Sequence, residues 1–290
     1  MIMVDDPRVA VRALKRNPYQ PVPLPKPLPQ GRARFPSPPS SANAGVFSPP
    51  AHLAELARRV NSASVDQLLA LVEADFPDAN QVEGDDVFQR RRTERIVERA
   101  WAAQQLGERG VKSKRVATLE RLVRERSLHK DRLYHGLDGA MATRALGQLG
   151  ATESVPVLVE AFRRVDPELK RVANPALAQY PLVWADFRAK MYVLPALGEL
   201  QCAEAKKFLL EYLAMDEAQA RELSAPQFEE ATQALFCHRL DGNEIAALLR
   251  SPNSAVRGTA ILECIDHPTP SRRRALRAAA PWARELPSRK

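Results

Sequence analysis

Histidine and cysteine are the side chains of this sequence with the widest chemistry, since both bind metals and both serve in catalysis. Five histidines are present, at positions 52, 129, 135, 238 and 267. A zinc site on a helix needs two ligands one turn apart and further ligands converging on them. His129 and His135 are six residues apart in an expected interhelix loop, and the adjacent Cys237 and His238 point to different helix faces. The spacing therefore predicts no metal site, and no Cys-His catalytic pair follows from it.

The cysteines do not form the pattern of a disulfide framework. Cys202, Cys237 and Cys264 are odd in number, lack CxxC spacing and each lie among apolar residues of expected helices. Free cysteine is among the most often buried residue types. We therefore expect three buried free thiols.

The glycine-rich stretch "ATRALGQLGATESVPVLVEAF" (142–162) could be a phosphate loop or a structural joint. A phosphate loop places its glycines after a strand and before a helix, and none of the usual glycine motifs is present. Here the glycines follow apolar residues at helical spacing. We expect Gly147 to permit close helix packing, Gly150 to end the helix in a left-handed cap, and Thr152 or Ser154 to cap the next helix. The stretch therefore predicts a joint between two helices.

The same unit recurs along the chain. The segments "AWAAQQLGERG" (100–110), "GAMATRALGQLG" (139–150) and "KMYVLPALGELQ" (190–201) align a Leu-Gly pair at offsets of 40 and 51 residues, and an amphipathic segment follows each. The aligned pairs are Leu106-Gly107, Leu146-Gly147 and Leu197-Gly198. Further helix pairs are expected in 51–75, 227–250 and 254–280. A period of about 40 residues with a helical hairpin in each unit predicts an all-α, right-handed α-solenoid of about five or six hairpins.

These units resemble the HEAT-like repeats of bacterial proteins, a type also found in phycobiliprotein lyases. The segment "SPNSAVRGTAILECI" (251–265) is similar to the repeat's Asp-x-x-Val-Arg-x-x-Ala pattern through Val256, Arg257 and Ala260, with Ser251 or Asn253 in place of the aspartate. The resemblance covers about residues 90–280 and implies a fold more than a function. Residues 171–189 depart from the repeat as an insertion, and insertions in solenoids often lie on the binding face.

Composition divides the chain into an arm, a repeat domain and a tail. Residues 17–50 hold 11 of the 24 prolines, so we expect residues 1–50 to be a disordered proline-rich arm, a spacer or a recognition segment. The repeat domain is expected over 51–280 and a basic tail over 281–290. No apolar run is long enough to cross a membrane and no signal peptide precedes the arm, so a cytoplasmic location without membrane contact is expected.

The net charge of +8 belongs to the two ends. Residues 1–50 carry seven basic and two acidic residues, residues 272–290 carry seven basic and one acidic, and the body between them is slightly acidic. Within the body, residues 108–132 form the most basic stretch, with Lys114, Arg115 and Arg121 as candidate contacts for a polyanion. We expect weak nucleic-acid binding through the ends.

The second helix of each hairpin in such a solenoid usually lines the concave face. Its expected outward residues are mixed in sign, which suits a protein or peptide better than a uniformly negative duplex. These candidate binding residues are Arg163, Arg164, Lys207 and Glu211. We therefore expect a non-catalytic scaffold that binds another protein, with no cofactor, metal or catalytic residue.

Two alternatives remain open. The basic ends and the basic patch near Lys114 favour a nucleic-acid binder or a HEAT-like DNA glycosylase, and the repeat resemblance alone suggests a phycobilin-lyase-like enzyme. The segment "VWADFRAK" places Trp184, Asp186 and Arg188 together, the residue types that such glycosylases use. Residues two apart lie about 200° around a helix, so Asp186 is expected to turn away from the other two.

Overall fold

The computed structural model describes residues 51–76, 84–110, 115–125, 127–129, 134–164, 181–223 and 227–279, with the backbone alone for 51–52, 181–189 and 221–222. All regular structure in these residues is helical, which confirms the all-α prediction. The arm expected over 1–50 and the tail over 281–290 lie outside the described residues.

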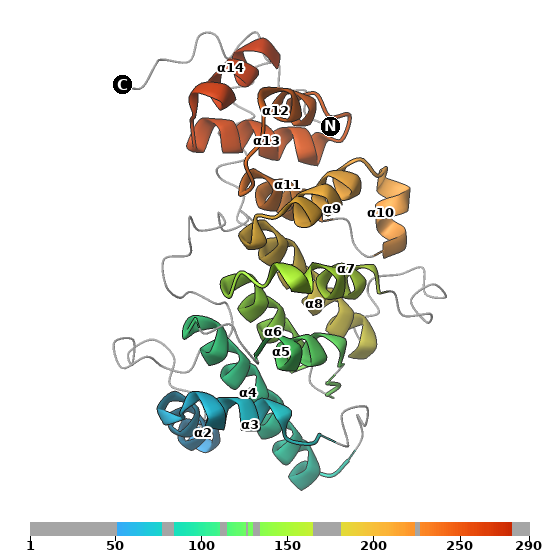
Figure 1. Cartoon of the computed structure of the whole chain (residues 1–290). Coiled ribbons are helices and arrows are strands. Elements are labelled where there is room, and N and C mark those ends of the chain that lie inside the picture. The colour runs from blue at the N-terminus through green and yellow to red at the C-terminus, as the bar shows by residue number, and fades with distance from the viewer. Residues whose placement is uncertain are drawn as a thin grey trace.

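The described helices fall into six consecutive pairs, with one additional short helix (Figure 1). The pairs are α2 (Ala51–Ser62) with α3 (Val65–Glu73), α4 (Asp86–Glu108) with α5 (Arg115–Arg124), α6 (Leu137–Gln148) with α7 (Val155–Arg163), α8 (Pro181–Leu200) with α9 (Ala203–Leu213), α11 (Phe228–Phe236) with α12 (Gly242–Leu249), and α13 (Ser254–Asp266) with α14 (Pro270–Ala279). The additional helix is α10 (Glu217–Leu223), and a short 3-10 turn over Thr152–Ser154 precedes α7.

The pairs pack in chain order in two rows. We call α2, α4, α6, α8, α11 and α13 the first row, because each packs on the next member of that series. The second row contains α3, α5, α7, α9, α12 and α14; α3, α5, α7 and α9 pack successively, as do α12 and α14. Each second-row helix except α14 also packs on the following first-row helix. The pairs accordingly succeed one another from α2 and α3 at one end of the molecule to α14 at the other (Figure 1).

Glycine and alanine meet at three successive first-row contacts. A Cβ placed on Gly107 would lie 2.8 Å from the Cα of Ala145, one on Gly147 would lie 2.9 Å from the Cα of Ala196, and one on Gly198 would lie 3.0 Å from the Cα of Ala234. In each case the contacted alanine belongs to the next first-row helix. Ala145 and Ala196 directly precede the Leu-Gly pairs of α6 and α8. The three glycines that align in the sequence therefore also make equivalent contacts between helices.

The helices that carry these glycines end in the same backbone conformation. Gly150 has φ +60°, its N–H donates to the carbonyl of Gly147, and the N–H of Ala151 donates to that of Leu146, which together form the predicted left-handed cap. Gly110 occupies the same place after α4 with φ +70°. After α8 this place belongs to Gln201, with φ 48°, and no other non-glycine residue in the described part of the chain has a positive φ.

The prediction that Thr152 or Ser154 caps the next helix through its side chain is wrong. Ser154 is the residue before α7, but it has helical backbone angles and makes no capping hydrogen bond. Its hydroxyl donates instead to Glu120 Oε1 of α5, at 2.8 Å. The 3-10 turn directly before α7 already satisfies local amides, including the Ser154 N–H on the Ala151 carbonyl.

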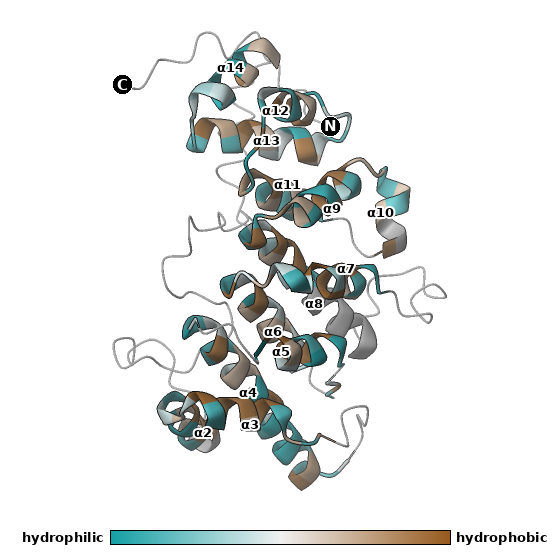
Figure 2. Cartoon of the chain, in the orientation of Figure 1, coloured by the Kyte–Doolittle hydropathy of each residue, from teal (hydrophilic) through white to brown (hydrophobic). Residues whose placement is uncertain are grey.

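Alanine and leucine dominate the core between the rows. The aligned leucines Leu106, Leu146 and Leu197 are fully buried. Brown hydrophobic and teal hydrophilic residues mix along most ribbons, as expected for helices with one buried face (Figure 2). No helix among the described residues combines the length and apolar character needed to span a bilayer.

All three cysteines are free thiols, but only one is buried. Cys264 is buried, Cys202 is half-buried and Cys237 is exposed. The expectation of three buried thiols is wrong for Cys237, which lies at the C-terminal cap of α11, and it is met only in part by the half-buried Cys202. The neighbour of Cys237, His238, points inward, with Nε2 3.0 Å from the Leu197 carbonyl oxygen.

Candidate functional site

Three of the predicted binding residues come together on the second row. Arg163 at the end of α7 lies 3.9 Å from a carboxylate oxygen of Glu211 on α9, and Lys207, one turn before Glu211, lies 3.9 Å from its other oxygen. Each side chain is about half exposed or more. One carboxylate thus lies between two cations from neighbouring pairs, and we call Arg163, Lys207 and Glu211 the surface triad.

A cluster of aromatic side chains packs against the surface triad through Arg163. The Arg163 guanidinium lies over the Phe208 ring, 5.5 Å from its centroid. Phe208 and Tyr212 each pack edge-on against Phe162 of α7, and Tyr212 stacks on Phe228 of α11. Edge-to-face pairs and cation-π contacts each add about 0.5–1.5 kcal/mol to the burial of the rings. The triad is therefore anchored to a cluster that joins α7, α9 and α11.

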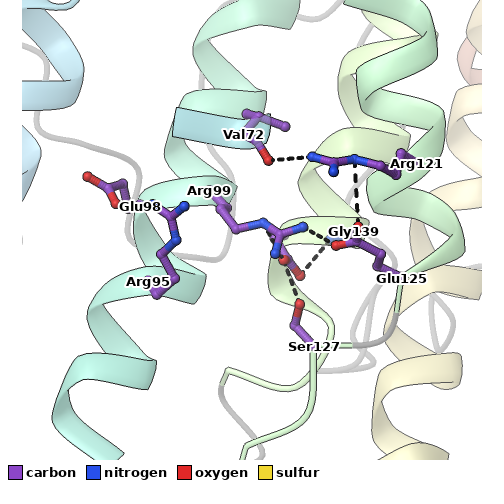
Figure 3. Close-up of polar contacts among 9 residues, drawn as sticks. Val72, Arg95, Glu98, Arg99, Arg121, Glu125, Ser127 and Gly139 are labelled. Atoms are coloured by element: carbon purple, nitrogen blue, oxygen red, sulfur yellow. Dashed lines mark hydrogen bonds and ion pairs between the residues drawn. The ribbon is translucent and has the colours of Figure 1, made fainter. Parts of the chain in front are cut away.

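Arg121 and Arg164 lie on the second row but apart from the triad's ion pairs. Arg121 donates to the Val72 carbonyl of α3 at 3.0 Å, and its Nε lies 3.7 Å from Glu125 (Figure 3). Arg164 donates to the Val123 carbonyl of α5 at 3.4 Å. Each arginine binds the end of the preceding second-row helix. Both side chains therefore join one helix pair to the preceding pair. The sequence did not predict this structural role.

The described arginines of the basic stretch around α5 are buried or bonded to neighbouring residues. Arg115 is buried, with 2% of its surface exposed, so it does not present its charge to a ligand. Arg124 is paired with Glu120 one turn away, and Arg121 is engaged as described above. Lys114 lies outside the described residues. Fewer hydrogen-bond donors of the described α5 arginines therefore remain for a phosphate.

A buried ionic cluster behind the second row was not predicted. Arg99 of α4 and Asp138 of α6 are each only 1% exposed, with Arg99 Nε 3.4 Å from Asp138 Oδ2. Arg99 also pairs with Glu125 at the end of α5 (Figure 3). Ser127 Oγ donates to Asp138 at 2.6 Å, and the Gly139 N–H donates to it at 2.9 Å.

The ionisation of Asp138 reflects these opposing surroundings. Burial raises the pKa of the Asp138 carboxyl above its ordinary value, while Arg99, Ser127 and the Gly139 amide act to lower it. A buried pair of this kind is costly to break, because removing one partner leaves an uncompensated charge. The cluster joins α4, α6 and the segment after α5, so it fixes how the second and third pairs sit against each other.

Further polar contacts extend this cluster along α4. Glu98 is buried and accepts hydrogen bonds from Arg59 of α2 and Arg95 of α4. The Arg92 guanidinium lies over the Phe76 ring, 5.0 Å from its centroid, and Nε donates to the Leu128 carbonyl at 2.6 Å. One polar side of α4 thus contacts the first pair and the segment before α6. The only available signal in the sequence was the density of charge in "QRRRTERIVER" (89–99), a pattern more typical of a solvated face.

Three of the histidines, His129, His135 and His238, are buried within the fold. His129 and His135 are both buried, the His129 N–H donates to His135 Nδ1 at 2.8 Å, and the Thr93 hydroxyl lies 2.9 Å from His129 Nε2. No group of three or more metal-ligating side chains converges anywhere in the described residues. The alternative trio at positions 184, 186 and 188 falls in α8, whose first nine side chains are outside the described set, as are residues 171–180 of the expected insertion.

Comparisons with protein-family models, with curated proteins and with solved structures give no match. The surface triad holds side chains of both charge signs at fixed positions on helices, which suits the binding of another molecule.

Proposed function

We propose that this chain is a non-catalytic scaffold, a right-handed α-solenoid of HEAT-like helical hairpins, that binds another protein or peptide through its second-row helices. The fold part of the proposal rests on the contacts of Gly107, Gly147 and Gly198 with Ala145, Ala196 and Ala234. A contact repeated between equivalent positions places each pair on the next with a similar small rotation, which is how a solenoid grows. The concave face of such a solenoid is lined by the second row.

The observation that carries the functional part is the surface triad. Arg163, Lys207 and Glu211 present both signs of charge at fixed positions, and the aromatic cluster beneath them limits the side-chain entropy lost on binding. A partner with an acidic and a basic residue at matching spacing would replace weak exposed ion pairs with stronger, desolvated ones. Charge complementarity of this kind confers specificity and speeds association.

Large apolar side chains contribute little to the described surface. Among the large hydrophobic residues that the structure describes, only Val87 and Met191 are exposed. Obligate interfaces are rich in such residues, whereas transient ones are about as polar as ordinary surface. We therefore propose a transient partner, in the cytoplasm.

Site-specific photo-crosslinking tests this proposal. A photoreactive amino acid replaces Glu204, which is exposed one turn before Lys207 on α9, in the full chain and, as the control, replaces exposed Glu229 on first-row helix α11. In cells of the native host, a discrete crosslinked species is expected from position 204 and not from 229. The double variant Arg163→Glu, Glu211→Lys should abolish it, while Arg58→Glu, Glu55→Lys, a charge swap in an exposed pair of α2, should not. Equal crosslinking at both positions would contradict the proposal.

A further inference from the structure

Helix α13 is buried on one side only. Its buried residues Val256, Thr259, Ala260 and Cys264 lie together on one side of the helix, since successive residues turn by 100°. By contrast α6, which packs on both α4 and α8, has ten of its twelve residues buried, against four of thirteen in α13. Helix α13 packs on α11, and no first-row helix follows it in the described residues. It therefore has one first-row neighbour where α6 has two.

The opposite side of α13 carries an apolar stripe. Gly258, Ile261, Leu262 and Ile265 follow one another at helical spacing, and each is half-buried. A Cβ placed on Gly258 meets no neighbouring atom within 4 Å, so the helix surface is open there. We call these four residues the α13 stripe. The stripe belongs to the last helix pair, at the end of the molecule opposite α2 and α3 (Figure 1).

The first helix of the row has a different outer side. Terminal repeats of a solenoid need a polar outer face to stay soluble. The described α2 side chains that are not buried meet this need with one alanine and five polar residues: Ala54, Glu55, Arg58, Arg59, Asn61 and Ser62. The α13 stripe offers a glycine and three large aliphatic residues instead. It continues the surface through which first-row helices stack, and it is suited to contact with a further helix.

We propose that the α13 stripe is the interface of a homodimer, in which two copies pack α13 against α13 about a twofold axis. A twofold interface must be self-complementary, and the stripe meets this condition. With the two helices antiparallel and the axis midway between Gly258 and Ile265, Ile265 of each copy faces the open surface at Gly258 of the other. Ile261 and Leu262 of both copies then meet near the axis. The large side chains thus fall where the opposite helix is either open or equally apolar.

A second copy suits the stripe better than the sequence that follows α14. The segment "APWARELPSRK" (280–290) offers six positions from Pro281 to Leu286 before the next proline, and proline interrupts a helix interior. The shortest first-row helix, α11, has nine residues. Head-to-tail stacking of copies would set the apolar stripe against the polar outer side of α2. A twofold dimer avoids that mismatch, because each stripe contacts its own copy.

The dimer should be weak, and it should be independent of the surface triad. The stripe extends about 10 Å along the helix, so one helix contact of this size buries less than a standard protein interface. We expect a dissociation constant of about 1–100 µM. The triad lies on second-row helices α7 and α9, so the dimer stands whether or not the scaffold proposal holds.

Sedimentation velocity of the full chain, from about 1 to 200 µM, tests the proposal across this range of affinity. The wild type should pass from monomer to dimer as its concentration rises. Gly258→Glu should weaken the dimer at least about tenfold, because it places an unpaired carboxylate in the interface. Gly242→Glu is the matched control: Gly242 is exposed at the start of second-row helix α12, also with nothing within 4 Å of its Cβ position. This control should dimerise like the wild type.

A second variant separates crowding from charge. Gly258→Gln fills the same space without a charge and should also weaken the dimer, because it occupies the surface that faces Ile265 of the other copy. Both variants at position 258 should keep the thermal midpoint of the dilute wild type or exceed it, since glycine is a poor helix former and its Cβ position is open.

Two results would overturn the assignment. A wild type that stays monomeric at every concentration would mean that a second copy does not cover the stripe. A dimer as strong in both variants at position 258 as in the wild type would place the contact between copies on another surface.

Discussion

Gly147 of α6 lies so close to Ala196 of α8 that a Cβ on the glycine would be 2.9 Å from the alanine Cα and 2.7 Å from Glu199 Oε2. Real Cβ atoms do not approach a backbone atom this closely, so the two helices meet at a distance that only glycine permits. The interface between the third and fourth pairs therefore depends on one missing methyl group.

The first prediction is that Gly147→Ala destabilises the protein. The added methyl group must push α6 away from α8, and overpacking of this kind costs about 1–3 kcal/mol. Gly258→Ala is the matched control: Gly258 lies within α13 with nothing within 4 Å of its Cβ position, so alanine should stabilise that helix by up to about 1 kcal/mol. Urea denaturation measures both. A stabilising effect of Gly147→Ala would contradict the close contact.

The second prediction is that Gln201→Gly stabilises the protein. Gln201 has φ 48° at the place where the two preceding units carry glycine, and the left-handed conformation costs a non-glycine residue roughly 1–2 kcal/mol. The greater freedom of glycine in the unfolded chain offsets part of this, so a gain of about 0.5–1 kcal/mol is expected.

The reverse change provides the control for that position. Gly150→Gln should destabilise by a similar amount, since open space surrounds the Gly150 Cβ position and only the backbone conformation resists the change. Thermal and urea unfolding of the two variants should therefore shift in opposite directions. Shifts of the same sign would show that conformation does not govern these caps.

The third prediction concerns the buried pair Arg99 and Asp138. Arg99→Met should destabilise the protein by about 3–5 kcal/mol, because it leaves the Asp138 carboxylate buried with no cation beside it. Arg90→Met, which breaks an exposed pair with Glu94, should change stability by less than about 1 kcal/mol. A double-mutant cycle with Asp138→Asn should show strong coupling at positions 99 and 138. Additive effects would mean that the two charges act independently.

The fourth prediction is a pH dependence that arises from Glu199. Burial raises the pKa of this carboxyl from 4.5 to about 7, although Arg144 acts to lower it. Between these values the folded protein retains a proton that the unfolded chain has released. Stability is therefore highest below about pH 4.5 for this group and falls as the pH rises to about 7, by up to about 3 kcal/mol.

Urea denaturation between pH 4.5 and 8 tests this dependence. Glu199→Gln should remove this part of the decline, leaving stability near the wild-type value at pH 4.5 and above it at pH 8. Glu204→Gln, at an exposed position in the first turn of α9, is the control and should retain the wild-type profile. A decline unchanged by Glu199→Gln would assign the pH dependence to other groups.

The helix pairs and their ends follow from the sequence because they depend on local properties. The spacing of Leu106, Leu146 and Leu197 marks a buried helix face, and Gly150 favours a left-handed cap whatever lies nearby. The register of the glycines was also readable, since equivalent positions recur. These patterns need only neighbouring residues to act, which is why they predicted the helices and the joint between α6 and α7.

Tertiary structure decided whether each charged side chain is buried, paired or exposed. Arg115 and Arg274 both lie in basic helices, yet one is buried and the other exposed, because burial depends on which side of a helix meets its neighbours. Arg99 and Asp138 are 39 residues apart, and they pair only because α4 packs on α6. The sequence by itself determined the helix pairs and the glycine cap of α6. Packing between distant helices determined which charges became structural and which stayed exposed.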